Sequence, residues 1–339
     1  MNIAHLLPYS ALFPLVKHNG RYEWALRLAR IQATQGHTVT IYAAPGSTEK
    51  GSTVAWKSID ESLHDKNANN IALMSLALSN PNHEIYHSHF DYLHYTLGNQ
   101  TSKPIIFTQH WFPNQKIAEA SKLSTAQNVY AVAPTFYMAK ENERLGIKTL
   151  TTIYHGIDLD LFYPADNPTN NRLLFIGRIT PTKGVREVVD IARAGNHMLD
   201  IIGKVNDTDT DYWKSILPLI DGENIRYLGP KSQSEVAQLM AQARSMLFVP
   251  HAVEAFGQVI IEAQACGTPV ITNDKGANSE LVDDGVSGFV IGSDGDYESA
   301  IQKLATINRK NCRKVAEKFD LNVMFDSYMQ QYTQLLTRA

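Results

Sequence analysis

Short apolar and β-branched runs alternate with helical patterns along the whole chain of 339 residues. This alternation is typical of parallel sheets whose strands are joined by crossover helices. In the first half, strands are expected at 3–7, 38–43, 85–88, 105–108, 129–133 and 149–153, with a helix at 20–35. In the second half, strands are expected at 173–176, 199–202, 225–228, 246–249, 270–272 and 288–291. The sequence therefore predicts an α/β protein with two similar half-sheets.

The length is about twice the roughly 150 residues of one domain. Residues 154–171 contain Gly156, Pro164, Pro168 and several Asp and Asn residues, a composition typical of a linker. We therefore expect an N-terminal domain over residues 1–155 and a C-terminal domain over residues 156–319. After residue 311 the pattern is helical, with an apolar stripe of Met324, Tyr328, Tyr332 and Leu335.

Composition excludes several classes of protein. Hydrophobic residues at 44% and charged residues at 19% are ordinary globular values, which exclude disordered and fibrous chains. A net charge of -3 gives no basic field for a polyanion, so nucleic acid is not an expected partner. Cys266 and Cys312 are too few for a disulfide framework, which fits a cytoplasmic protein. Without a signal peptide or a run of about 18 apolar residues, any membrane contact is expected to be peripheral, at the inner membrane face.

A loop with two cations, residues 177–184, directly follows an expected strand and precedes an expected helix. At the carboxyl edge of a parallel sheet, backbone N–H groups, the helix dipole, Arg178 and Lys183 can converge on a phosphate. The loop is not a P-loop, because Thr182 replaces a Gly and Gly184 follows the Lys. The alternative interpretation is a plain turn with two solvated cations.

Two carboxylates, Glu254 and Glu262, flank the expected start of a helix near Phe256. Glu262 lies among apolar residues, so its carboxylate needs hydrogen-bond donors, which the hydroxyl groups of a ligand can supply. The alternative makes Glu254 a charge at a helix start and Glu262 a residue of an exposed face.

These motifs together resemble glycosyltransferase family 4, the retaining glycosyltransferases of group 1. The residues that carry the resemblance are the segment 154–162, the loop 177–184, Tyr227–Pro230, the pair Glu254 and Glu262, and Gly285–Phe289. The resemblance implies a GT-B fold, in which two Rossmann-like domains face a central cleft. It also implies that the second domain binds a nucleotide-sugar donor and the first binds the acceptor. The last helix, about 320–339, is then expected to pack back on the first domain.

The resemblance assigns roles residue by residue. Arg178 and Lys183 would grip the donor diphosphate beside Gly177, Glu254 would contact the sugar hydroxyls, and Glu262 would bind the ribose. Backbone N–H groups of Phe256, Gly257 and Gln258 would face sugar and phosphate.

In the first half, the segment 18–23 resembles the glycine loop that meets the donor phosphate, with Arg21 in place of a second Gly after Gly20. His110, at the end of an expected strand, matches a His near the transferred sugar, and His89 is a weaker acceptor-side candidate. Nine of the 12 His residues precede residue 150, which indicates either a polar site or surface composition.

The predicted function is retaining, metal-independent transfer of a sugar from a nucleotide-diphosphate sugar, which serves as co-substrate without a further cofactor. The acceptor is expected to be a carbohydrate, a lipid or a small molecule. Asp207, Asp209 and Asp211 resemble a metal-binding Asp-x-Asp motif, but two cations already fill the phosphate role. The alternatives are a nucleotide-sugar epimerase or hydrolase of the same fold, a non-catalytic sugar-nucleotide-binding subunit and a nicotinamide dehydrogenase.

Overall fold

The computed structural model describes residues 1–14, 19–60, 64–166, 168, 170–293 and 295–338. The chain divides into two compact units. Unit 1 consists of Met1–His155 together with Asn322–Ala339, and unit 2 consists of Gly156–Leu321. Each unit is built around one parallel sheet.

Unit 1 holds a seven-stranded parallel sheet in the order β3-β2-β1-β4-β5-β6-β7. Its strands are β1 (Asn2–Leu6), β2 (Thr38–Tyr42), β3 (Ala55–Lys57), β4 (Ile85–Ser88), β5 (Ile105–Thr108), β6 (Val129–Ala133) and β7 (Thr149–Thr152). The order reverses beside β1, which pairs with both β2 and β4. The carboxyl ends of β1 and β4 therefore lie at a topological switch point, where α/β proteins commonly bind ligands.

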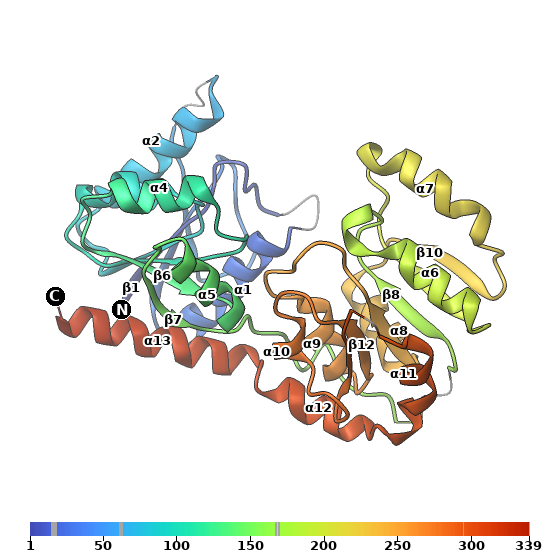
Figure 1. Ribbon diagram of the computed structural model, residues 1–339. Helices are drawn as coiled ribbons and strands as arrows, with labels where there is room; N and C mark the ends of the chain where they lie inside the picture. Colours follow the sequence, from blue (N-terminus) through green and yellow to red (C-terminus); the bar gives the residue numbers. More distant parts are fainter. Residues whose placement is uncertain (15–18, 61–63, 167, 169, 294, 339) are drawn as a thin grey trace. The chain divides into compact units, whose positions relative to one another are not determined.

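Helices connect these strands. They are α1 (Gly20–Thr34), α2 (Lys66–Leu78), α3 (Leu93–Leu97), α4 (Gln115–Leu123) and α5 (Phe136–Arg144). A last helix, α13 (Leu321–Arg338), lies alongside the strands of this unit, in red in Figure 1. Its predicted stripe is buried, and Tyr328 and Tyr332 are fully inaccessible to solvent.

Unit 2 holds a six-stranded parallel sheet in the order β10-β9-β8-β11-β12-β13. Its strands are β8 (Leu173–Ile176), β9 (Leu199–Ile202), β10 (Ile225–Gly229), β11 (Ser245–Phe248), β12 (Val270–Asn273) and β13 (Gly288–Ile291). Its helices are α6 (Val185–Ala194), α7 (Thr210–Ile216), α8 (Gln233–Gln242), α9 (Gln258–Ala265), α10 (Asn278–Leu281), α11 (Tyr297–Lys303) and α12 (Arg309–Glu317). The predicted pair of Rossmann-like sheets is therefore confirmed.

The spacing of apolar residues explains how α6 covers its sheet. Val185, Val188, Val189 and Ala192 recur on one helical face, and all four are fully buried against Phe175 and its neighbours. This packing fixes the start of α6, and with it the loop that leaves β8. The sequence of unit 2 thereby determines where the predicted phosphate loop lies.

Candidate functional site

The loop between β8 and α6 lies against the segment that follows β11. The Thr182 carbonyl accepts hydrogen bonds from the backbone N–H groups of His251 and Ala252, at 3.0 and 3.1 Å. Gly184 has a φ of 71°, and a Cβ there would lie 1.8 Å from the Val249 carbonyl oxygen. Only Gly fits this close approach without moving the backbone. The structure thus joins the two motifs of unit 2 at the carboxyl edge of its sheet.

Lys183 and Glu254 form an ion pair within this edge. Lys183 Nζ donates to Glu254 Oε1 at 2.6 Å, and the two side chains are only 20% and 17% exposed. The sequence placed both residues in the donor site, but it gave no indication that they pair. Arg178 is exposed, and no ion pair joins it to another described residue. The edge therefore offers one paired and one unpaired cation to an anionic ligand.

The start of α9 differs from the prediction. The helix was expected to begin near Phe256, but it begins at Gln258, after Gly257 at the N-cap position with a φ of 78°. A left-handed residue breaks the helical backbone, so Phe256 lies outside the helix and its side chain is buried. The backbone N–H groups of Gly257 and Gln258 still lie at the helix start, where anions are favoured.

Glu262 is half-buried on α9, and neither of its two sequence interpretations anticipated a donor within the same helix. Gln258 Nε2 donates to Glu262 Oε1 at 2.9 Å, one helical turn away.

Among the described residues, the three carboxylates of the alternative metal motif do not form a group with the spacing of a metal site. Asp209 accepts from Asn206, and the 98% exposed Asp211 pairs with Lys214.

In unit 1, the predicted glycine loop is described only from Asn19 onward, because His18 lies outside the described residues. Gly20 is the first residue of α1, and a Cβ there would meet nothing within 4 Å. Arg21 Nη1 donates to the carbonyl of His89 at 3.2 Å, and its Nη2 lies 3.3 Å from Asp91 Oδ1. Arg21 is therefore held in position beside the end of β4.

The half-buried His110 belongs to a cluster of imidazoles that lies around Trp24. The ring centroids of His87, His89, His110 and His155 lie 5.1 to 5.8 Å from that of Trp24. Burial lowers the pKa of His5 to about 4 and that of His155 to about 3. Burial also lowers the pKa of His110 well below its usual value, as do the nearby His155 and Arg21. These imidazoles are therefore neutral at pH 7.

Sequence reasoning missed His5, His87 and Gln32 as members of this cluster. The excess of His residues before residue 150 was the available signal, but it could not separate a site from surface composition. His5 lies on β1, His87 on β4 and Gln32 on α1, so only the fold brings them together.

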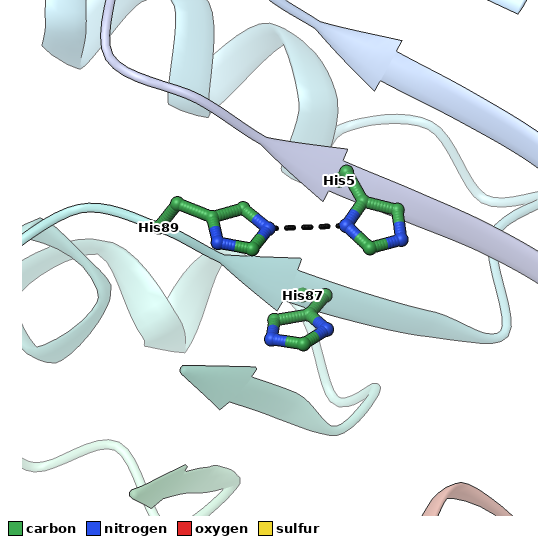
Figure 2. A group of neighbouring side chains, drawn as sticks. All are labelled: His5, His87 and His89. Atoms are coloured by element: carbon green, nitrogen blue, oxygen red, sulfur yellow. Dashed lines mark hydrogen bonds between the residues drawn. The ribbon is translucent and has the colours of Figure 1, made fainter. Parts of the chain in front are cut away.

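His5, His87 and His89 have the spacing of a metal site, since one ligand atom of each lies within 4.8 Å of the others. Figure 2 shows the rings of His5 and His89 edge to edge, with a hydrogen bond of 3.0 Å between them. All six ring nitrogens have hydrogen-bond partners, which besides one another are Gln32, Thr108, His110 and Tyr332. An ion would leave some of these buried partners unpaired, so the arrangement favours a hydrogen-bond network over a metal centre.

The segment from residue 160 to residue 322 matches the family described as glycosyl transferases group 1. The matched segment contains every strand of unit 2, from β8 to β13. Among curated relatives, the chain is 27% identical over 244 residues to a glycosyltransferase of Methanocaldococcus jannaschii, covering 68% of this chain and 67% of that protein. It is 26% identical over 307 residues to the D-inositol 3-phosphate glycosyltransferase of Gordonia bronchialis, covering 75% of this chain and 66% of that protein.

Solved structures share the fold of this chain. The match to the Anabaena protein HepE, which was solved in complex with UDP-glucose, covers all of both chains. Its TM-score is 0.76 and the sequence identity is 20%. These comparisons support a glycosyltransferase, and they do not favour the epimerase, hydrolase or silent-subunit alternatives. None of the helices in the described part of the chain is long and apolar enough to cross a membrane.

Proposed function

We propose that this chain is a retaining, metal-independent glycosyltransferase of family 4 that transfers a sugar from a nucleotide-diphosphate sugar to an acceptor. The observation that carries this proposal is the Lys183–Glu254 pair beside Arg178, at the sheet edge where α9 begins. A cation that can bind phosphate and a carboxylate that can bind hydroxyl groups are thus in direct contact.

Arg178 and Lys183 are assigned to the donor diphosphate, beside Gly177. As the nucleotide leaves, negative charge grows on the phosphate oxygens, and two cations stabilise that charge more than they stabilise the bound donor. The backbone N–H groups of Phe256, Gly257 and Gln258 are assigned to the sugar and the phosphate. This arrangement takes the place of a divalent cation, because positive charge is already supplied by the chain.

The two carboxylates are assigned to hydroxyl groups. Glu254 accepts hydrogen bonds from the donor sugar, and Lys183 orients that carboxylate. Glu262 binds the ribose, held by Gln258. In unit 1, His110 contacts the transferred sugar, while Gly20 and Arg21, at the start of α1, are assigned to the donor phosphate.

In the proposed reaction, the bond between the anomeric carbon and the phosphate oxygen breaks while the acceptor oxygen bonds to the same face of that carbon. The departing phosphate oxygen takes the acceptor proton, so no protein nucleophile is required. The acceptor is a carbohydrate, a lipid or a small molecule. Cytoplasmic location and peripheral membrane contact through unit 1 stay predictions.

A nucleotide-sugar panel tests the proposal, with UDP-glucose first because HepE was solved with it. We expect one donor to bind and to undergo slow hydrolysis that requires Arg178. If a donor bound without hydrolysis or transfer to any acceptor, the chain would be a silent sugar-nucleotide binder. If no donor bound, the proposal would be wrong.

A further inference from the structure

A continuous line of hydrogen bonds runs from Gln32 to His110 inside unit 1. His5 Nε2 lies 2.7 Å from Gln32 Oε1, and His5 Nδ1 lies 3.0 Å from His89 Nε2. His89 Nδ1 lies 3.1 Å from His110 Nε2. Gln32, His5 and His89 are at most 1% exposed, so water does not supply alternative partners. The ring nitrogen that carries the proton in one histidine therefore determines which nitrogen carries it in the next.

The amide oxygen of Gln32 can only accept a hydrogen bond, so His5 must carry its proton on Nε2. A neutral imidazole has one N–H, which leaves His5 Nδ1 as an acceptor for a proton on His89 Nε2. By the same reasoning, His89 Nδ1 accepts from His110 Nε2–H. His110 then carries no proton on Nδ1, and within the described residues no hydrogen-bond partner of that atom is recorded.

The other end of the Gln32 amide contacts α13. Gln32 Nε2 donates to the hydroxyl oxygen of Tyr332 on α13 at 3.4 Å, and this hydroxyl also lies 2.6 Å from His87 Nδ1. If the amide were reversed, its N–H would face His5, and every proton along the line would move to the other ring nitrogen. His110 would then present an N–H at Nδ1.

We propose that Gln32 is a positioning residue that fixes the tautomer of His110 through His5 and His89, so that His110 Nδ1 accepts a hydrogen bond from a hydroxyl group of the transferred sugar. The part that concerns the sugar rests on the proposed function, whereas the tautomer order does not. A residue 78 positions before His110 thereby determines what His110 offers to a ligand.

The tautomers can be read directly from long-range ¹H–¹⁵N correlation spectra of the full chain with labelled histidine at pH 7. We expect the Nε2–H tautomer for His5, His89 and His110 in the unmodified protein. Gln32→Met removes the amide at similar volume and should leave His110 as a mixture of both tautomers. Gln32→Glu retains an oxygen acceptor and should retain the order. His94, which contacts Ser88 and not the line, is the internal reference and should not change.

In a transfer assay, Gln32→Met should lower kcat in proportion to the fraction of His110 that loses the Nε2–H tautomer, about twofold for an even mixture, while the Kd for the nucleotide diphosphate stays unchanged. An Nδ1–H tautomer at His110 in the unmodified protein would overturn the proposal, as would an unchanged His110 tautomer in Gln32→Met. If the tautomers behave as expected but kcat is unaffected, the sugar contact is wrong and the tautomer order stands. The spectra are informative even if no donor is found, so failure of the proposed function is distinguishable.

Discussion

Lys183 and Glu254 are 71 residues apart in the chain, yet Lys183 Nζ lies 2.6 Å from Glu254 Oε1. The pair joins the loop after β8 to the segment before α9, and it is mostly shielded from water. Removing Lys183 therefore has two effects: the diphosphate loses a cation, and a half-buried carboxylate loses its partner. Removing Arg178 has only the first effect, because its exposed side chain pairs with no described residue.

The first prediction concerns these two cations. Arg178→Ala and Lys183→Ala should each lower turnover by the equivalent of roughly 2 to 4 kcal/mol of transition-state stabilisation. Arg178→Ala should leave the urea midpoint unchanged, whereas Lys183→Ala should lower it. Steady-state kinetics and urea unfolding check both. Lys214→Ala removes an exposed cation far along the chain and is the matched control. Normal turnover in the double variant would contradict the diphosphate assignment.

The second prediction is that transfer persists in excess chelator, because Arg178, Lys183 and the start of α9 supply the positive charge. Initial rates are compared with and without EDTA, then after addition of Mg²⁺ or Mn²⁺. The double variant Asp209→Asn with Asp211→Asn should be as active as the unmodified protein. If EDTA abolished activity and these ions restored it, a metal site at Asp207, Asp209 and Asp211 would be indicated instead.

The third prediction separates the role of His110 from nucleotide binding. His110→Ala should reduce transfer at least tenfold while the Kd for the nucleotide diphosphate, measured by calorimetry, changes little, because His110 is assigned to the sugar. Trp111→Ala, at the exposed neighbouring position, is the control for a change in the same loop. Equal losses in transfer and in nucleotide affinity would place His110 at the phosphate instead.

The strands could be predicted almost residue by residue, because β-branched runs between turn residues leave little alternative. β3 could not, since Ala55–Lys57 is only three residues long and has no apolar run of its own. The start of α9 was misplaced because the sequence does not reveal that Gly257 adopts a left-handed conformation. The hydrogen-bond line from Gln32 to His110 was also invisible, because it combines α1, β1 and the loops after β4 and β5, and Tyr332 holds its first member from 300 residues away.

The fourth prediction concerns acid stability. The pKa of His5 falls from 6.5 to about 4 and that of His94 to about 3 on folding, in both cases because of burial. Between these values and 6.5 the unfolded chain binds more protons than the folded chain, so stability decreases as pH falls from about 6.5 toward 4.

The burial of each of these two histidines should lower the free energy of unfolding by about 2 kcal/mol as the pH falls from 7 to 5. Urea unfolding followed by tryptophan fluorescence measures the slope, since Trp24 is buried in unit 1. His94→Phe should reduce the slope of the unfolding free energy against pH by the equivalent of close to one proton. The variant should still lose stability as the pH falls. A stability that is flat between pH 7 and pH 5 would mean that the buried imidazoles are not neutral in the folded chain.

The last prediction concerns α13. The hydroxyl of Tyr332 bonds to His87 at 2.6 Å and to Gln32 at 3.4 Å, and all three side chains are fully buried. Tyr332→Phe keeps the ring but leaves polar atoms of His87 and Gln32 without this partner. An unsatisfied buried polar group costs about 1 to 3 kcal/mol, so the urea midpoint should fall while the slope of the transition stays the same. Gln334→Ala, at an exposed position of the same helix, should have almost no effect. If both variants unfold at the same urea concentration as the unmodified chain, the hydroxyl does not contribute to the network that α13 closes.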